Sequence, residues 1–240
     1  MDYFDKAETW DRATLETVQL ARLKTTIQQA SRAPFYAKRL AEAGVSADNL
    51  RSLEDIRRIP FTSKDDLRSQ YPYGLATVPH SEFVRMHCSS GTTGTPVAVC
   101  YTQPDINSWA DLMARCLYMA GVRKDDVFQN MSGYGLFTGG LGIHFGAERL
   151  GCMTIPAGAG NSKRQLKLVK DFGTTVAHIL PSYALHLGTT LIEEGEDPKA
   201  LSLRIACVGA EPYTEETRRR IEALFDMKVY NSYGLSEMNG

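Results

Sequence analysis

Hydrophobic and polar positions follow two different patterns along the chain, and the change falls near residue 83. Before it, the segment 14–30 carries apolar residues at near-helical spacing among many charged positions. Pro34 and Ser52 are typical of the starts of further short helices, and Pro60 is expected to end one of them. We therefore expect residues 1–82 to form a helical amino-terminal region with solvated charged faces.

From residue 83 onward, short β-branched runs alternate with amphipathic segments. The expected strands are 83–87, 97–101, 127–131, 152–155, 175–180, 203–208 and 228–231, and the expected helices are 104–120, 140–149, 163–172, 183–194 and 215–225. This order predicts an α/β region over 83–240 with right-handed βαβ crossovers and a largely parallel sheet. Ligands of such sheets bind beyond the carboxyl ends of the strands, so the loops there are the candidate sites.

Composition narrows the class of protein. The 240 residues are 43% hydrophobic and 23% charged, which is ordinary for a globular protein and excludes disorder as the main state. With 27 basic and 28 acidic residues the net charge is −1, which argues against nucleic acid as the main partner. Five scattered cysteines indicate reduced thiols, and no stretch is long and apolar enough for a membrane helix. We expect a soluble, cytoplasmic protein.

The first unusual stretch is Ser89-Ser90-Gly91-Thr92-Thr93-Gly94-Thr95-Pro96. Glycines let backbone N–H groups approach an anion, and hydroxyls add donors without bulk, so this loop suits a polyphosphate. It is not the Walker loop, because the Gly-Lys-Ser/Thr ending is missing and a strand follows. Taken alone, the stretch fits anion binding and a plain hairpin between strands 83–87 and 97–101 equally well.

Two later stretches follow expected strands. Gly209-Ala210-Glu211-Pro212 comes after 203–208, and its small residues leave room for a flat ligand against the backbone. Asn231-Ser232-Tyr233-Gly234-Leu235-Ser236-Glu237 gathers an amide, a ring, a hydroxyl and a carboxylate. An amide can pair with a base edge, a ring can stack on it, and a carboxylate can hold Mg²⁺ near phosphate. Each stretch alone could also be an ordinary loop.

A fourth stretch, 132–142, has five glycines around Tyr134 and Phe137. Rings flanked by glycine can line a slot for another ring. The alternative is a glycine-rich loop whose aromatic side chains fill the core, and the residues themselves leave both open.

Together, the stretches 89–94, 209–212 and 233–237 have the order and spacing of the adenylate-forming acyl-CoA ligases. Within that superfamily the chain resembles the phenylacetate–CoA ligase family, from about Ala33 to Gly240. The segments that carry this closer resemblance are 71–74, 134–142, 146–151 and 181–183. The resemblance implies the amino-terminal domain of an adenylate-forming enzyme. It also implies that ATP and an aryl acid give an acyl-adenylate and diphosphate, after which CoA gives the thioester and AMP.

The resemblance further implies residue roles. The nucleotide would be bound by Ser89, Ser90, Gly91, Thr92, Thr93, Gly94, Thr95, Gly209, Ala210, Glu211, Pro212, Asn231, Ser232, Tyr233, Gly234 and Ser236. Tyr134, Phe137, Gly140, Ala147 and Gly209 would line the aryl-acid pocket. The catalytic residues would be Thr92, Ser236, which approaches the α-phosphate, and Glu237, which binds Mg²⁺. ATP, Mg²⁺ and CoA are thus the expected cofactor and co-substrates, and a homodimer is possible.

Two departures from the family pattern qualify these expectations. Thr95 stands where the family often has lysine, which removes a cation near the diphosphate. Family members also continue past the 233–237 motif into a small domain that bears a catalytic lysine, so we expect Gly240 to end an amino-terminal portion or a truncated product. Two alternatives are therefore a ligase for another aryl acid, similar to benzoate or indoleacetate, and a nucleotide-binding module without turnover. A dinucleotide oxidoreductase and a serine hydrolase are disfavoured, because their glycine-rich and nucleophile-elbow motifs are missing.

Overall fold

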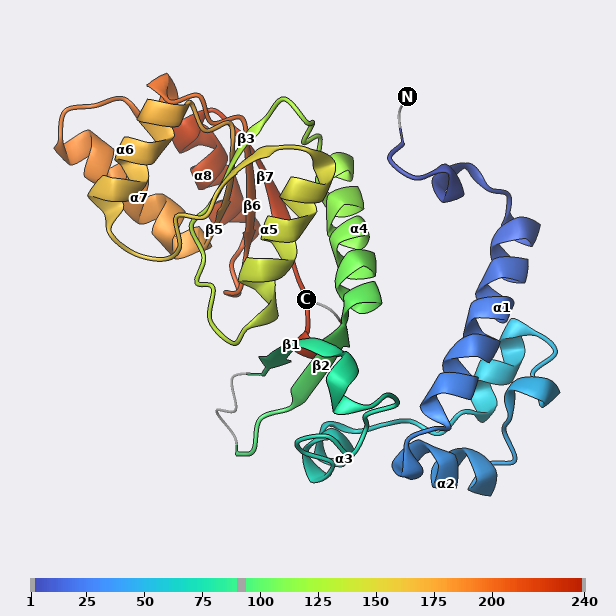
Figure 1. Cartoon of the computed structure of the whole chain (residues 1–240). Helices are drawn as coiled ribbons and strands as arrows, with labels where there is room; N and C mark the ends of the chain where they lie inside the picture. Colours follow the sequence, from blue (N-terminus) through green and yellow to red (C-terminus); the bar gives the residue numbers. More distant parts are fainter. Residues whose placement is uncertain (1–2, 90–93, 239–240) are drawn as a thin grey trace. The chain divides into compact units, whose positions relative to one another are not determined.

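The computed structural model describes residues 3–89 and 94–238, and the chain folds into two compact units (Figure 1). The first unit is Met1–Pro104 and the second is Asp105–Gly240. The change of pattern at residue 83 thus falls inside the first unit, at the start of its strands. The division into a helical region 1–82 and a binding region 83–240 stays a prediction.

The first unit consists of helices and one antiparallel hairpin. Its α-helices are α1 (Arg12–Ala30), α2 (Pro34–Glu42) and α3 (Lys64–Ser69). Helix α1 begins after Asp11, whose carboxylate accepts a hydrogen bond from the Thr14 amide, and α2 begins at a proline, as the sequence predicted. Strands β1 (Phe83–Cys88) and β2 (Ala98–Thr102) pair antiparallel. A small core of Ile27, Leu40, Val45, Ala47 and Leu50 joins the helices.

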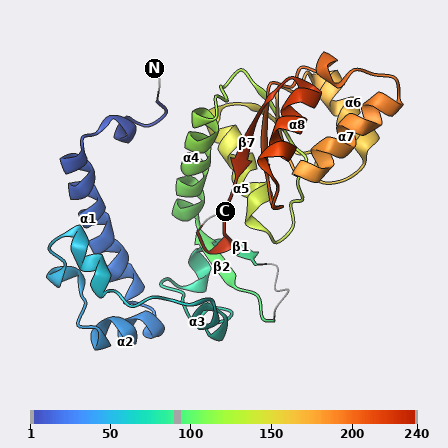
Figure 2. The same ribbon diagram turned by 180° about the vertical axis from the view of Figure 1, so that it is seen from behind.

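The second unit is a five-stranded parallel sheet covered by helices on both faces (Figures 1 and 2). Its strands are β3 (Val127–Asn130), β4 (Met153–Ile155), β5 (Val176–Ile179), β6 (Ile205–Gly209) and β7 (Lys228–Ser232). The helices are α4 (Gln103–Met119), which begins at the end of the first unit, α5 (Thr138–Leu150), α6 (Ser162–Phe172), α7 (Pro181–Glu193) and α8 (Glu215–Phe225). This confirms the α/β class and the alternation expected from the sequence.

The order of the sheet is β4-β3-β5-β6-β7, and every neighbouring pair is parallel. Because parallel strands end at one edge, the segments after β3, β5, β6 and β7 lie next to one another. Side chains alternate between the faces. Ala177 and Val208 pack in the core beneath α6, α7 and α8, whereas Val176 and Cys207 pack beneath α4 and α5.

Helix ends in this unit are set by local sequence. Helix α5 ends at Gly151 with a φ of 95°, and α6 ends at Gly173 with a φ of 62°. Both values lie in the left-handed region that favours glycine. Within the described residues, no helix is long and apolar enough to cross a membrane.

Candidate active site

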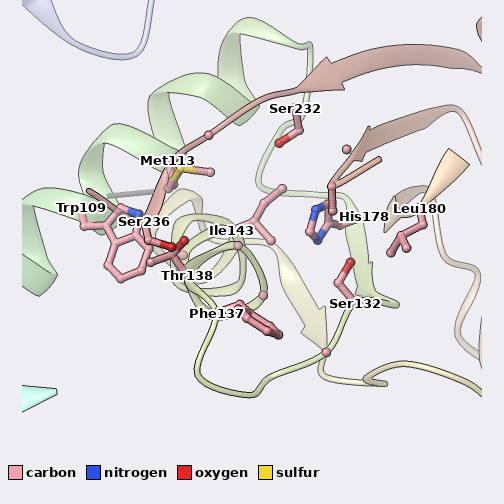
Figure 3. Close-up of a pocket in the computed structure, with 17 residues that line it drawn as sticks. Trp109, Met113, Ser132, Phe137, Thr138, Ile143, His178, Leu180, Ser232 and Ser236 are labelled. Carbon is pink, nitrogen blue, oxygen red and sulfur yellow. The ribbon is translucent and has the colours of Figure 1, made fainter. Parts of the chain in front are cut away.

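A largely apolar cavity of about 370 Å³ opens at the carboxyl ends of β3, β5, β6 and β7, beside α4 and α5 (Figure 3). Helices and the loop before α5 contribute Trp109, Met113, Phe137, Thr138 and Ile143. The strand ends and the loops after them contribute Ser132, His178, Leu180, Gly209, Ala210, Ser232, Gly234 and Ser236. A concave apolar space with few polar groups is typical of a small-molecule site.

Glycines set the shape of this cavity, because side chains or backbone occupy the space that a Cβ would need. A Cβ on Gly142 would lie 2.5 Å from the Trp109 indole, so the glycine lets that ring approach α5 closely. A Cβ on Gly140 would lie 2.1 Å from the carbonyl oxygen of Gly133. The glycine-rich stretch therefore has a packing role: it brings the cavity wall and α5 close together.

A hydrogen-bonded pair of buried polar residues stands in this apolar surrounding. His178 Nδ1 lies 3.0 Å from Asn130 Oδ1, and Asn130 Nδ2 donates to the Gly140 carbonyl at 2.8 Å. Asn130 is completely buried and His178 is 8% exposed. Burial lowers the pKa of His178 to about 4, so the imidazole is neutral at pH 7.

A second, more polar cavity of about 620 Å³ lies beyond the ends of β6 and β7. Its lining residues belong to the two loops that the sequence singled out and to the start of α8: Ala210, Glu211, Pro212, Tyr213, Thr214, Glu215, Arg218, Asn231, Ser232, Tyr233 and Gly234. The Tyr233 side chain is 81% exposed, which leaves its ring available for stacking on a planar ligand. Ala210 has a φ of 66°, an uncommon conformation for a residue other than glycine.

Hydrogen bonds hold the loop that carries Ala210. The Glu211 carboxylate accepts from the Ser182 hydroxyl at 2.8 Å and from the Ser182 amide at 3.2 Å. Ser182 is in the first turn of α7, where a carboxylate is favoured by the helix dipole. Glu211 thus joins the loop after β6 to the first turn of α7, which fixes the turn between the cavities.

Arg218 is the cation at the polar cavity, and two carboxylates bind it. The hydrogen bond with Glu215 raises the pKa of Arg218, and the same bond lowers the pKa of Glu215 to about 2. Arg218 Nη1 also donates to Glu222 at 2.7 Å. Because its charge is compensated, Arg218 shapes this wall more than it attracts anions.

The two cavities share a wall. Ala210, Ser232 and Gly234 line both of them, so these small residues lie at the boundary between a largely apolar chamber and a more polar one. A ligand with a hydrophobic part and a polar, planar part could occupy both chambers at once.

The structure places most of the predicted residues of the second unit at these cavities. Phe137, Gly140, Gly209 and Ser236 line the apolar cavity, and the residues of 209–212 and 231–234 line one or both chambers. Tyr134 is not among the lining residues. Its hydroxyl lies 3.0 Å from His144 Nδ1, and burial raises its pKa. Ala147 is a residue of α5 and is completely buried in the core between this helix, α4 and the sheet.

The predicted phosphate loop lies in the first unit. Ser90, Gly91, Thr92 and Thr93 are outside the described residues, so their expected roles stay predictions. Ser89 closes the base of the loop: its hydroxyl accepts from the Val97 amide at 3.0 Å, and its own amide donates to the Val97 carbonyl at 2.9 Å. Gly94 has a φ of 130°, which requires glycine, and Thr95 is exposed.

The described residues contain no group of three or more His, Cys, Asp or Glu side chains that could hold a metal ion by themselves. Glu237 is half-buried in a short 3₁₀ turn next to Ser236, which lines the apolar cavity. A single carboxylate fits Mg²⁺ that arrives on a nucleotide, because this ion is usually bound by one or two carboxylates together with phosphate oxygens and water.

Comparison with known proteins identifies the class to which this fold and site belong. The family model for AMP-binding enzymes matches residues 13–240, so the chain belongs to the AMP-binding enzyme family. It is 47% identical to a phenylacetate-coenzyme A ligase of Pseudomonas putida over 98% of this chain and 54% of that protein. It is 46% identical to the phenylacetate-coenzyme A ligase of Thermus thermophilus over 100% of this chain and 54% of that protein. The chain thus spans about half the length of these relatives.

A solved structure gives the same picture in three dimensions. The structure of 2-hydroxyisobutyryl-CoA ligase with 2-HIB-AMP and CoA superposes with a TM-score of 0.89 at 32% identity. The match covers 96% of this chain and 51% of that one. The resemblance to adenylate-forming ligases seen in the sequence motifs is therefore confirmed for family and fold.

Sequence reasoning assigned no site role to several residues that line the apolar cavity. Trp109 and Met113 belong to an apolar stripe that also fits an ordinary buried helix face. His178 belongs to the expected strand 175–180 and was assigned no role beyond that strand. A signal did exist, since a histidine at the carboxyl end of an otherwise apolar parallel strand points to the binding edge of the sheet.

Proposed function

We propose that this protein is, or forms part of, an AMP-forming aryl-acid–CoA ligase, with phenylacetate as the leading substrate. The observation that carries the proposal is the pair of adjoining chambers, one apolar and bordered by Phe137 and Trp109, the other polar and bordered by Tyr233 and Asn231. An aryl-adenylate has these two halves. The phenylacetate-coenzyme A ligases at 46–47% identity support the same reaction class.

The residues of the chambers suit the chemistry of the first step. A carboxylate is a weak nucleophile, so holding it in line with the α-phosphorus and neutralising charge supply most of the catalysis. The apolar chamber takes the ring, and its shared wall at Ala210 and Ser232 directs the carboxylate toward the nucleotide. Tyr233 stacks on the adenine, and the Asn231 amide binds its amino edge. Ser236 approaches the α-phosphate.

The remaining roles follow the family resemblance. The 89–95 loop binds the β- and γ-phosphates through backbone and hydroxyl donors. Glu237 is the residue that would hold Mg²⁺, and that ion would supply positive charge beside the phosphates. CoA is the thiol that completes the reaction.

Acid-dependent exchange of labelled diphosphate into ATP tests the proposal directly. The protein, expressed from its complete reading frame, is assayed with phenylacetate, benzoate, indoleacetate, hydroxylated phenylacetates and 2-hydroxyisobutyrate. We expect exchange with aryl acids and the highest kcat/KM with a phenylacetate-type acid. Absence of exchange with every aryl acid would reject the substrate class, and exchange with 2-hydroxyisobutyrate alone would replace it by a small hydroxy acid.

Glu237→Gln tests the metal role within the same assay. The substitution keeps the size of the side chain but removes its charge, so exchange should fall at least tenfold while aryl-acid affinity changes little, in line with the loss of a charged transition-state contact. Normal exchange with unchanged Mg²⁺ dependence would show that Glu237 does not place the metal.

A further inference from the structure

The chamber that would take the aryl group is largely apolar, but the polar side chain of His178 lines it. His178 lies at the end of β5, on the sheet face beneath α4 and α5, and it lines the cavity together with Ile143 and Leu180 (Figure 3). Its side chain is almost fully buried. A buried polar group needs a hydrogen-bond partner for each of its polar atoms, so both nitrogens of this ring require an explanation.

The neighbours of Asn130 decide which nitrogen carries the proton. Asn130 Nδ2 donates to the Gly140 carbonyl, and Asn130 Oδ1 accepts from the Ser132 amide at 3.1 Å. If the Asn130 side-chain amide were rotated by 180°, its NH₂ group would face the Ser132 N–H and its oxygen would face the Gly140 carbonyl. Neither pair can form a hydrogen bond, so the orientation of the amide is determined. The Oδ1 atom can only accept, and therefore His178 Nδ1 is the protonated nitrogen that donates to it.

The other nitrogen is consequently an acceptor. Burial keeps the ring neutral at pH 7, as described above, so Nε2 carries a lone pair and no proton. Among the described residues Nε2 has no hydrogen-bond partner, although the ring borders the cavity. Asn130 thus holds an imidazole acceptor for which the described residues supply no donor, and a ligand in the cavity could supply one.

We infer that the acid activated by this protein carries a hydrogen-bond donor on its ring system, a hydroxyl or a ring N–H, which meets His178 Nε2 in the apolar chamber. This inference rests on the proposed function and makes it more specific: phenylacetate stands for the parent class of acids, and within that class we expect acids with a ring hydroxyl, or with an N–H in a heteroaryl ring, to be preferred. A buried acceptor left without a donor disfavours a ligand that cannot supply one, so selection in this chamber would depend on hydrogen bonding as well as on shape.

A series of matched acids tests the inference in the unaltered protein. Phenylacetate, its 2-, 3- and 4-hydroxy derivatives, the corresponding methoxy derivatives and indole-3-acetate are compared by kcat/KM in diphosphate exchange and by Kd in calorimetry. We expect at least one donor-bearing acid to exceed phenylacetate by about tenfold or more, and its methoxy counterpart to lose that advantage. Equal values for phenylacetate and all donor-bearing acids would overturn the inference.

Two histidine variants make the assignment to His178 specific. In His178→Leu, the ratio of kcat/KM for the donor-bearing acid to kcat/KM for phenylacetate should fall close to one. In His178→Gln, whose amide oxygen can accept a hydrogen bond, the ratio should stay partly above one. His186→Leu is the control, since this histidine is exposed on α7 and does not line the cavity. Persistence of the full preference in a folded His178→Leu protein would overturn the role of this residue.

The ligand comparison keeps the test decisive if His178→Leu does not fold. The outcomes also separate the two proposals. If diphosphate exchange occurs with phenylacetate and the donor-bearing acids have no advantage over it, only the present inference is wrong. If no aryl acid supports exchange, the proposed function is wrong.

Discussion

Gly209→Ala is the sharpest perturbation of the shared wall. Gly209 ends β6, pairs with Ser232 of β7 in the parallel register, and both residues line the apolar cavity. A Cβ at this position would lie 2.1 Å from the Ser232 carbonyl oxygen and 3.1 Å from its carbonyl carbon. The first contact would have to lengthen to at least 3.0 Å, and the obstacle is backbone, so β6 and β7 must separate at their carboxyl ends.

Overpacking of this kind costs about 1–3 kcal/mol. For a chain of this length, that corresponds to a decrease of about 2–12 °C in the melting temperature. Because the strands separate at the wall between the chambers, the affinity for a non-hydrolysable aryl-adenylate analogue should fall by about tenfold or more, in keeping with the sensitivity of positioned ligands to small displacements. Thermal unfolding measures the first effect and calorimetry the second.

Gly135→Ala is the matched control. A Cβ on Gly135 meets no atom within 4 Å and its φ is not positive, so the same chemical change should leave melting temperature and affinity nearly unaltered. If Gly209→Ala behaves like Gly135→Ala in both measurements, the close approach of β6 and β7 is not what shapes the site.

Three further predictions concern other parts of the second unit. Ser182→Ala removes the hydroxyl that donates to Glu211, so the Kd for ATP should rise about three- to tenfold with little change in melting temperature. Ser182→Thr keeps a hydroxyl and should retain the affinity for ATP. An unchanged Kd in the alanine variant would contradict this positioning role. Burial alone would raise the pKa of Asp126, but hydrogen bonds, chiefly from Arg204, lower it overall. The carboxylate therefore stabilises the fold above its unfolded pKa of about 4, and this contribution is lost as the pH falls through the lower folded pKa. In urea unfolding at pH 7, Asp126→Asn should lower the free energy of unfolding by about 3 kcal/mol, and this free energy should depend less on pH below about pH 4. The same pH dependence in the variant and in the unaltered protein would refute the role of the ion pair. Phe137→Ala removes a ring that lines the acid chamber and should reduce discrimination among aryl acids in diphosphate exchange, while an unchanged ranking of acids would count against that chamber as the acid site.

The alternation of strands and helices was predictable because it follows from local periodicity. Runs such as 205–208 are apolar throughout, as expected for a strand covered on both faces, and α4 and α6 carry apolar residues at helical spacing. The loops 209–212 and 231–237 were also recognisable, since small, polar and aromatic residues gather directly after these strands. Parallel topology then implied that such loops meet at one edge.

The placement of individual side chains was not predictable in the same way. Tyr134 and Phe137 share one glycine-rich stretch, yet Phe137 lines the cavity while the Tyr134 hydroxyl hydrogen-bonds to His144 of α5. Nothing in the local pattern separates the two rings, because the direction of a loop side chain depends on what packs against it. Ala147 illustrates the same limit: Ile143, one turn earlier in α5, lines the cavity, whereas Ala147 lies in the core.

The sequence by itself determined the order of the elements, the family motifs and the end of the sheet at which they gather, because periodicity and strand direction are local properties of the chain. Only the tertiary structure decided that Ala210, Ser232 and Gly234 separate two chambers, and that Asn130 fixes the proton of His178. These relations join residues from different strands, and the packing of the sheet and its helices alone brings their atoms within contact distance.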